Sequence, residues 1–529
     1  MGQGPTVTAG PARPSFTRRA LLAGAASPLL GCDSAPAVSG TLRGAGAERG
    51  HLLRRQHAWP APAAMGRVRV LIAGAGVAGL AASRALRQRG IDDFALLELE
   101  DLAGGNSRGS EIGGIACPLG AHYLPVPGDS ARDVQDFLEE AGLRQRIAGR
   151  WVYDERHLCH APQERLFFRG HWQDGLLPLH GVAPSTLSQY QRFAVLVEQA
   201  GRTAPFTIPA PTVPAAAHRA LDAVTFAVWL DRQGLADAHL RWYLDYCCRD
   251  DYGAGIDTVS AWAGLHYFAS RHGFQPPGHD GGEREAVLAW PEGNAWLTRR
   301  LAAGLGERLR PGRVVLRIAQ GRHGVDIDAW NAATQGVERW QADHCIVALP
   351  LFVAARVVQD APALLHQRAR HIRYAPWAVA NLHLREPLRD RPGAAPSWDN
   401  VIYGAQGLGY VDARHQSLDP RPGPTVLTWY GAPGEAARER LLTRTWRDWQ
   451  DDVVAELSVP HPDLAGKLAR IEVARYGHAM AIPVPGGLAQ AASGLPRSGR
   501  LSFAHGDWAG YSIFEEAFTA GHRAGLAVV

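Results

Sequence analysis

The spacing of apolar residues predicts a strand, a helix and a second strand between residues 68 and 99. Residues 68–73 are a short run of β-branched and apolar side chains, which is typical of a buried strand. Residues 80–89 repeat apolar positions at helical spacing and stop at Gly90, a favourable helix C-cap. Residues 94–99 form a second apolar run. This order predicts a βαβ unit.

Further apolar runs predict elements in the middle and at the end of the chain. Residues 312–318 and 324–328 have the pattern of paired strands. Near the C-terminus, residues 501–507 predict a strand that runs into Gly-Asp, and residues 513–527 predict a closing helix.

Segments of mixed periodicity separate these runs. Residues 218–233, 236–250 and 259–271 are predicted to be helices that carry Trp and Tyr side chains. An aromatic stripe at helical spacing is typical of a packed core. Asp250 and Asp251 fall at the end of the second helix, where they can attract a cationic substrate, although a solvated helix cap is the default interpretation.

A glycine motif lies between the first strand and its helix. Residues 74–79 are Gly-Ala-Gly-Val-Ala-Gly, and Glu98 follows Gly74 by 24 positions. Gly74 allows a tight turn, Gly76 lets a pyrophosphate approach the backbone, and Gly79 lets the helix pack on the strand. The helix N-terminus favours phosphates, and an acid at this spacing favours ribose hydroxyls over a 2′-phosphate. The unit therefore predicts a dinucleotide site that does not hold NADP.

Composition narrows the class of protein. The chain has 529 residues, 46% of them hydrophobic, and 55 basic against 51 acidic residues, a formal charge of +4. This composition excludes wholesale disorder and a polytopic membrane protein, and so mild a charge argues against a nucleic-acid partner. Lys467 is the only lysine and lies in a predicted solvated helix, so we expect no catalytic lysine.

The first 31 residues predict an export signal rather than part of the fold. Arg18 and Arg19 precede an apolar run that is too short to span a bilayer. The pair resembles a twin-arginine signal, and the string Leu-Leu-Gly-Cys ending at Cys32 resembles a bacterial lipobox, whose cysteine is lipidated. We therefore expect export by the twin-arginine machinery, a periplasmic location and a lipid anchor at Cys32. Residues 32–66 are predicted to be a tether.

The cysteines predict neither a metal site nor a disulfide framework. Of the six, removing Cys32 leaves an odd number, and none has metal-ligand spacing. Cys247 and Cys248 are predicted to be buried thiols on a helix, with a vicinal disulfide as the alternative.

Three further segments carry a family resemblance. Residues 104–106 are Gly-Gly-Asn, residues 118–124 are Pro-Leu-Gly-Ala-His-Tyr-Leu, and residues 506–507 are the Gly-Asp before the closing helix. With the dinucleotide unit, they resemble the flavin-containing amine oxidase superfamily, which includes monoamine and polyamine oxidases, L-amino-acid oxidases and carotenoid desaturases. The resemblance covers the nucleotide-binding segments at both ends and part of the middle, but not the substrate-facing parts.

The resemblance implies an α/β fold, with a Rossmann-like FAD-binding domain assembled from discontinuous segments and a mixed α+β substrate domain. The FAD would be bound non-covalently, because no cysteine follows Cys345 to form the C-terminal link of monoamine oxidases. The expected segments are residues 67–150, 285–350 and 495–529 for the FAD-binding domain, and residues 151–284 and 351–494 for the substrate domain.

The resemblance also implies which residues hold the cofactor. They are Gly74, Gly76, Gly79, Glu98, Gly104, Gly105, Asn106, Val315, Gly506 and Asp507. Val315 is the candidate for a backbone contact to the adenine, although an ordinary core valine fits its pattern equally well. The family usually has an arginine where Asn106 stands, so one pyrophosphate contact must be made differently.

Aromatic residues near these segments are the candidates for catalysis. Tyr476 and Trp508 flank the C-terminal Gly-Asp, and His122 and Tyr123 lie in the segment that reaches the other side of the flavin in the family. An aromatic face attracts a cationic amine and orients it after it loses its proton.

We therefore expect an exported FAD-dependent oxidoreductase of the amine oxidase type. It would take a hydride from a carbon next to nitrogen in a small-molecule substrate, and oxygen or another acceptor would reoxidise the flavin. One alternative is a desaturase or isomerase acting on a lipid-like alkene. Another is a non-enzymatic flavoprotein, which the lack of the family's usual lysine would support.

Overall fold

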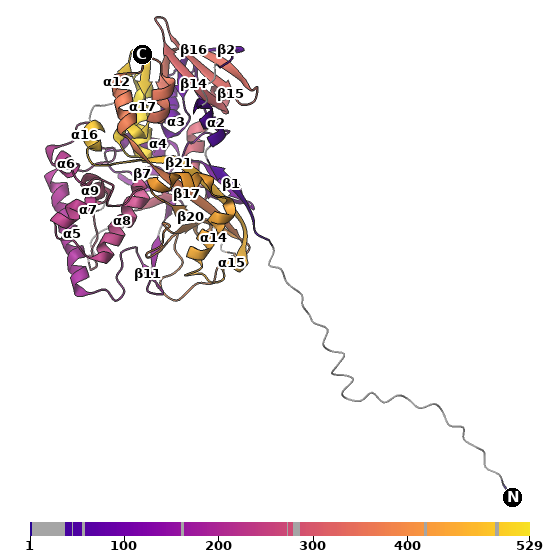
Figure 1. Cartoon of the computed structure of the whole chain (residues 1–529), viewed down its shortest axis with the longest axis vertical. Helices are drawn as coiled ribbons and strands as arrows, with labels where there is room; N and C mark the ends of the chain where they lie inside the picture. Colours follow the sequence, from indigo (N-terminus) through magenta and orange to yellow (C-terminus); the bar gives the residue numbers. More distant parts are fainter. Residues whose placement is uncertain are drawn as a thin grey trace. The chain divides into compact units, whose positions relative to one another are not determined.

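The computed structural model describes residues 1–2, 37–44, 46–54, 59–159, 163–271, 273–278, 286–416, 421–491 and 497–528. The folded body comprises Val38–Val529 (Figure 1). The predicted twin-arginine pair and the predicted lipidation site at Cys32 lie outside the described residues.

One large sheet carries the predicted dinucleotide unit. Strands β2, β3 and β16 are parallel, and β14 and β15 extend the sheet in antiparallel fashion from β16. The C-terminal strand β23 pairs with β16, so the two ends of the chain meet in one sheet. Its strands, in sheet order with the two branching strands last, are β13 (Leu309–Arg310), β3 (Phe94–Leu97), β2 (Ala64–Ala73), β16 (Gly336–Val347), β15 (Val325–Asn331), β14 (Arg313–Gln320), β23 (Leu501–Phe503) and β22 (Arg497–Ser498).

Helices cover this sheet. The closing helix α17 packs tightly on α3, because a Cβ on Gly521 would lie 1.9 Å from the carbonyl oxygen of Ala78. The helices that contribute buried side chains to this part are α3 (Val77–Gln88), α4 (Arg132–Glu140), α10 (Ala295–Ala302), α11 (Leu351–Val357), α12 (Ala363–His371) and α17 (Phe514–Leu526). The predicted mixed α/β fold is therefore confirmed, with strand and helix positions close to those expected.

A second sheet carries the substrate part. Its strand order is β1 (Ser39–Gly44), β21 (Leu468–Ile482), β17 (Arg373–Leu384), β20 (Thr425–Gly431), β19 (Tyr410–Asp412), β18 (Asp399–Ile402), β10 (Glu164–Phe168) and β11 (His171–Asp174). The predicted tether is wrong for part of residues 32–66. β1 pairs with β21 along its whole length and Arg43 pairs with Glu472 at 3.0 Å, while Ala64 already begins β2.

Five helices gather on one side of this sheet, as Figure 1 shows in magenta: α5 (Pro184–Thr203), α6 (Ala216–Leu221), α7 (Phe226–Arg232), α8 (Ala238–Tyr252) and α9 (Ala261–Ala269). The single helix predicted for residues 218–233 is two, because Thr225 caps a new helix by accepting a hydrogen bond from the Val228 N–H. The aromatic side chains on α7, α8 and α9 pack in or against one core cluster, as their helical spacing predicted.

Short elements complete the body. They are β4 (Gly109–Ile112), β5 (Ile115–Pro118), β6 (Tyr123–Pro125), β7 (Arg144–Ile147), β8 (Arg150–Tyr153), β9 (Leu158–Cys159), β12 (Val287–Ala289), α2 (Ala47–His51), α13 (Arg438–Thr443), α14 (Trp446–Leu457), α15 (Leu464–Lys467), α16 (Gly487–Ala491) and the 3₁₀ turns Leu52–Arg54, Gly306–Arg308, Ala413–Gln416, Glu435–Ala437 and Gly506–Ala509.

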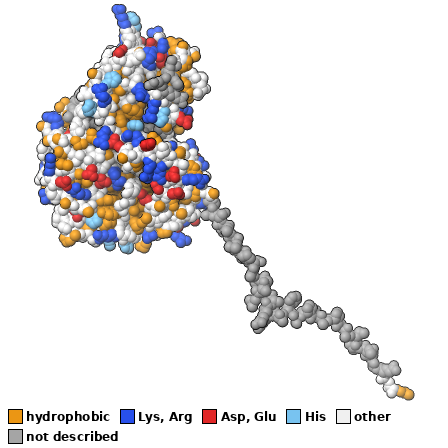
Figure 2. Space-filling view, viewed as in Figure 1, with side chains coloured by type: hydrophobic (Ala, Val, Ile, Leu, Met, Phe, Trp, Pro, Cys, Tyr) orange, Lys and Arg blue, Asp and Glu red, His pale blue; other side chains and the backbone are white. Residues whose placement is uncertain are grey.

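In the described part of the chain, no helix is both long and apolar enough to cross a membrane. The five cysteines of this part are buried and free, which confirms the prediction for Cys247 and Cys248. Figure 2 shows basic and acidic side chains intermingled over one face, in keeping with the small net charge.

Candidate active site

Two glycine loops meet at the N-terminus of α3. Gly74 has a φ of +98° and follows β2 directly, while Gly76 pairs with Gly104 in an isolated parallel bridge. A Cβ on Gly76 would meet nothing closer than Gly105, at 3.9 Å, so a side chain there would enter the space beside both loops. A Cβ on Gly79 would instead lie 1.9 Å from the carbonyl oxygen of Gly74. Gly76 therefore leaves room for a ligand, and Gly79 permits helix packing.

Glu98 holds the first glycine loop in place through hydrogen bonds. Its carboxylate accepts hydrogen bonds of 2.9 Å from the N–H groups of Ala75 and Glu100. Burial raises the pKa of Glu98 above its ordinary value, and these two hydrogen bonds only partly oppose that rise. The acid predicted to bind ribose thus also fixes the shape of the phosphate loop.

The side chain of Asn106 contacts a strand of the second sheet. Its side-chain amide donates to the carbonyl of Ala479 on β21 at 2.7 Å. Arg108 brings a guanidinium to the same loop from two positions later, donating to the carbonyl of Gly105 at 2.9 Å and pairing with Glu100 at 3.3 Å. We did not predict Arg108 from the sequence. The only signal for it was that the family's usual arginine is absent at position 106, two positions earlier.

The remaining predicted cofactor residues lie on neighbouring elements. Val315 is buried on β14, next to an irregularity in its pairing with β15. The side chain of Asp507 is already bound by protein groups: it accepts hydrogen bonds from the Tyr374 hydroxyl at 2.6 Å and the Leu351 N–H at 3.0 Å. Burial would raise the pKa of Asp507, but His505 and these hydrogen bonds outweigh burial and lower it. The expected contacts of Val315, Gly506 and Asp507 with the flavin stay predictions.

His122 and Tyr123 belong to a group of four rings. His122 stacks on Tyr430 with ring centroids 4.2 Å apart and lies 5.4 Å from Trp398, while Tyr123 meets Trp398 at 5.8 Å. Burial lowers the pKa of His122 to about 3, so its ring is neutral at physiological pH. We call His122, Tyr123, Trp398 and Tyr430 the ring group.

Three acids adjoin the ring group. The Tyr123 hydroxyl donates to Asp250 at 3.4 Å, and Asp399 directly follows Trp398. Glu164 on β10 and Asp399 on β18 are register partners on adjacent strands, so both side chains lie on one face of the sheet. We call Asp250, Asp399 and Glu164 the acid group.

The acid group is crowded with like charge. Burial, followed by repulsion from Asp251, raises the pKa of Asp250 to about 7. Burial, followed by repulsion from Asp250 and Glu164, raises the pKa of Asp399 well above its ordinary value. The default interpretation of a solvated cap is wrong for Asp251, which is buried and pairs with Arg271 at 3.1 Å. No sequence motif pointed to Asp399 or Glu164, because the sheet brings them together.

Tyr476 lies near Tyr430 of the ring group, whereas Trp508 lies in another core cluster. The buried Tyr476 donates its hydroxyl to the carbonyl of Leu119 at 2.6 Å, and the Arg108 guanidinium lies close enough to lower its pKa, although burial dominates and raises it to about 12. Trp508 instead packs in the core of the nucleotide part against Phe503, with Arg368 over its ring. The 3₁₀ turn Gly506–Ala509 directs it there, so the prediction that Trp508 joins the aromatic site is not supported.

Lys467 lies far from this site. It pairs with Asp463 at 2.8 Å at the beginning of β21, whereas Ala479 near the other end of β21 contacts Asn106. Lys467 and Ala479 are twelve positions apart along this segment, about 40 Å at the usual rise per strand residue. Within the described residues, no group of acids, histidines and cysteines has the arrangement of a metal site.

This fold and these loops define a nucleotide-binding oxidoreductase, and comparison gives the family. The chain belongs to the flavin-containing amine oxidoreductases, because the family model with that description matches residues 77–528. It is therefore an FAD-dependent oxidoreductase of the amine oxidase family.

Individual relatives are distant. An L-amino acid dehydrogenase from Synechocystis is 25% identical over 240 residues, which is 42% of this chain and 46% of that protein, so the chain spans about half the length of that relative. A putrescine oxidase structure with bound putrescine has a TM-score of 0.67 at 18% identity, over 87% of this chain and 98% of that one. A cyclohexylamine oxidase from Brevibacterium oxydans has a TM-score of 0.63 at 19% identity, over 87% and 98%.

The residues present fit FAD. The space beside Gly76 and Gly105 suits a pyrophosphate, the N-terminus of α3 favours its charge, and Glu98 lies at the spacing for ribose. Arg108 supplies a cation at the glycine pair.

Proposed function

We propose that this protein oxidises a small amine that arrives as a cation and is held by the ring group and the acid group. FAD supplies the acceptor for the hydride that leaves the carbon next to nitrogen. The nitrogen loses a proton to solvent, and water hydrolyses the resulting imine to a carbonyl compound and ammonia or a smaller amine. The protein's own residues bind and orient the substrate.

The observation that carries the proposal is the surplus of negative charge beside neutral rings. Beyond the effect of burial, Asp251 raises the pKa of Asp250, and Asp250 and Glu164 raise that of Asp399, so a bound ammonium group would relieve repulsion among these carboxylates. The ring group adds cation–π attraction, and the neutral His122 does not repel a cation.

The same charges favour an amine without a carboxylate over an amino acid. An amino-acid carboxylate beside Asp250 and Asp399 would meet like charge, and Arg271, which acts on Asp250, is itself paired with Asp251. A structural relative binds putrescine, which has two cationic ends and no carboxylate. A lipid-like alkene gains nothing from three acids, so the acid group also weighs against the desaturase alternative.

Anaerobic stopped-flow measurement of flavin reduction tests the proposal. We expect putrescine or cyclohexylamine to bleach the flavin absorbance faster than any L-amino acid at equal concentration. Bleaching by L-amino acids alone would transfer the proposal to an amino-acid dehydrogenase. No bleaching by any amine would favour the desaturase or the non-enzymatic alternative.

We also propose export and lipid anchoring, which the twin-arginine pair at Arg18 and Arg19 and the lipobox at Cys32 support. The folded body begins at Val38, so five residues separate it from Cys32. At a full extension of about 3.6 Å per residue, they would hold the body within roughly 20 Å of an anchored lipid.

A further inference from the structure

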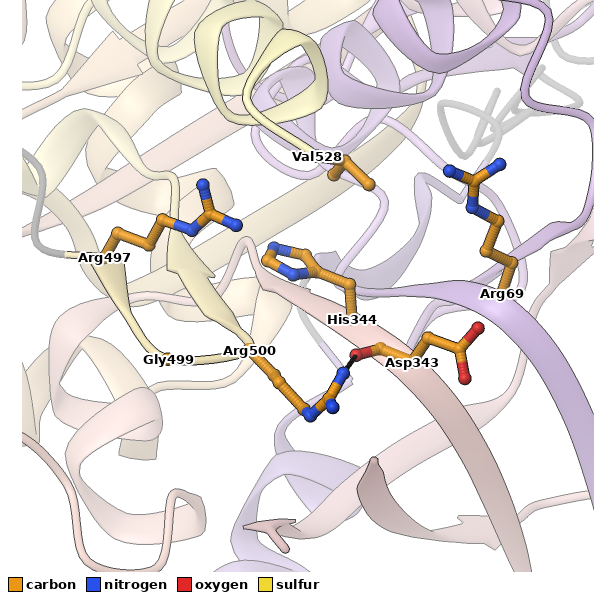
Figure 3. A pocket seen from close by; sticks show the side chains of 7 residues that line it. All are labelled: Arg69, Asp343, His344, Arg497, Gly499, Arg500 and Val528. Carbon is orange, nitrogen blue, oxygen red and sulfur yellow. Dashed lines mark hydrogen bonds between the residues drawn. The ribbon is translucent and has the colours of Figure 1, made fainter. Parts of the chain in front are cut away.

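A cavity of about 440 Å³ lies beside the middle of β2 and the neighbouring part of β16, in the sheet that carries the glycine loops (Figure 3). Its lining residues are Arg69, Asp343, His344, Arg497, Gly499, Arg500 and Val528. Arg69 precedes the glycine turn at Gly74 by five strand positions, about 16 Å. The cavity is therefore separate from the flavin site, the ring group and the acid group.

Positive charge dominates the lining. Arg69, Arg497 and Arg500 form no ion pair with any described residue, and the single carboxylate in the lining belongs to Asp343. His344 is buried and neutral, because burial, with Arg497 and Arg500 nearby, lowers its pKa to about 4. The lining thus has a net charge of two positive units; the Asp93 carboxylate, which accepts a hydrogen bond of 3.0 Å from the Arg69 N–H, lies outside it.

Helix capping accounts for only part of this charge. Arg497 donates to the carbonyl of Ala527 at 3.2 Å, and Arg89 donates to that of Leu526 at 2.9 Å, so both serve the C-terminal end of α17. A helix C-terminus carries about half a negative charge, so the charge of a single arginine already exceeds it. Arg69 and Arg500 make no contact of this kind with α17.

Two side chains of the lining are already held in place by hydrogen bonds. Arg500 donates to the backbone carbonyl of Asp343 at 3.0 Å, and the His344 Nε2 shares a hydrogen bond of 2.9 Å with the Ser502 hydroxyl. Figure 3 shows Arg497 and Arg69 on either side of His344. A guanidinium has five N–H donors, so Arg497 and Arg500 each have several left for a ligand.

We propose that this cavity is a second binding site, which takes a phosphate group either free or carried by a larger polar molecule. Arginine forks match the geometry of phosphate oxygens, and a dianion would balance the two uncompensated charges. The volume lies within the range of small-molecule sites and far exceeds one phosphate ion, so the group attached to the phosphate also has room. Val528 is the only aliphatic side chain in the lining, which favours a polar ligand.

Binding would link β2, β16, β22 and the end of α17, so it should raise the thermal stability of the protein. It should leave the flavin content unchanged, because Arg69 lies about 16 Å along β2 from the glycine turn. Neither thermal stability nor flavin content depends on turnover, so failure of this proposal can be distinguished from failure of the proposed amine oxidation.

Calorimetric titration of the full-length flavoprotein with inorganic phosphate, and separately with glycerol 3-phosphate, tests the site. Sodium chloride of equal ionic strength controls for screening. We expect phosphate to bind and to raise the Tm, and Arg497→Gln and Arg69→Gln each to weaken binding at least tenfold. The exposed Arg322 lies outside the cavity, so Arg322→Gln should bind like wild type. Flavin absorbance and Tm without phosphate verify that each variant folds.

Vesicles separate the two sources of phosphate. Full-length Cys32→Ala protein, which lacks the expected lipid anchor, is sedimented with phosphatidylglycerol or phosphatidylcholine vesicles. Co-sedimentation with phosphatidylglycerol alone that Arg497→Gln abolishes supports a lipid headgroup, whereas binding of soluble phosphate without co-sedimentation supports a free ligand. Absence of both, or binding that neither arginine variant changes, overturns the proposal.

Discussion

The carboxylate of Glu98 accepts a hydrogen bond of 2.9 Å from the N–H of Ala75, the residue between the first two glycines of the phosphate loop. The acid at the end of β3 therefore fixes the loop that begins at the end of β2. Its second acceptor oxygen binds the Glu100 N–H. The protein's own hydrogen bonds thus set the shape of the loop, and substitutions in it separate cofactor binding from folding.

Gly76→Trp should give folded protein without the flavin absorbance. The Cβ itself has room, since its nearest neighbour would be 3.9 Å away, but the indole would fill the space next to Gly105. Gly79→Ala should instead impair folding, because its Cβ would overlap the Gly74 carbonyl oxygen at 1.9 Å. Absorbance at the flavin band and circular dichroism measure the two effects.

Gly201→Ala is the matched control, since a Cβ there meets nothing within 4 Å. It should retain both the flavin and the fold. Normal flavin content in Gly76→Trp would refute the assignment of the loop to the cofactor.

Tyr476 and Trp508 should differ in what their loss affects. Tyr476→Ala removes a ring beside the Leu119 segment and Arg108, and should slow flavin reduction by about 10- to 100-fold, roughly 1.4 to 2.7 kcal/mol. Trp508→Ala leaves a cavity in the nucleotide core and should cost about 3–5 kcal/mol of stability with little change in the reduction rate. Stopped-flow kinetics and denaturant unfolding measure the pair, and a large rate loss in Trp508→Ala alone would restore it to the active site.

The nucleotide part was predictable because its signals are local. The glycines, the apolar run before them and Glu98 lie within one βαβ unit, where spacing alone dictates geometry. The tether was predicted less well, because residues 39–44 have no strand pattern of their own and gain order by pairing with β21. The division of the predicted helix 218–233 into two helices at Thr225 depends on a single capping hydrogen bond.

The substrate side could not be predicted to the same extent, because it is built from non-local contacts. Glu164 and Asp399 are 235 positions apart and meet only through the pairing of β10 with β18. His122 and Tyr123 were found from the family segment, but Tyr430, which stacks on His122, comes from β20 and has no motif. Trp508 was misplaced because neighbours in sequence can point to opposite sides of a turn.

Export should depend on the N-terminal arginine pair and acylation on Cys32. Arg18→Lys/Arg19→Lys should keep the protein out of the periplasm, and Cys32→Ala should abolish metabolic labelling with palmitate while leaving export intact. Fractionation followed by immunoblotting measures both. Periplasmic arrival of the double variant would refute the twin-arginine hypothesis, and the lack of acyl label in wild type would refute the lipoprotein hypothesis.

Asp250→Asn should change both substrate affinity and the dependence of stability on pH. The pKa of Asp250 rises from 3.8 to about 7 in the fold, mainly through burial. Between about pH 4 and 7 the folded protein holds a proton that the unfolded chain releases, so stability from this group is lost as pH rises through that window. The uncharged variant should therefore exceed wild type in stability at pH 8, by on the order of 1 kcal/mol given the coupling with Asp399.

The affinity of wild type for a cationic amine should rise with pH, whereas the stability contributed by Asp250 falls. Above about pH 7 Asp250 is ionised and attracts the ammonium, so we expect KM to fall severalfold between pH 6 and 8. Asp250→Asn should raise KM about 10- to 100-fold and flatten this dependence, because an amide has no charge to gain. Asp245→Asn is the control, since Asp245 lies on the same helix but pairs with Arg249 at 3.0 Å outside the acid group. A steep pH dependence that survives in Asp250→Asn would assign the titration to another group and remove Asp250 from substrate binding.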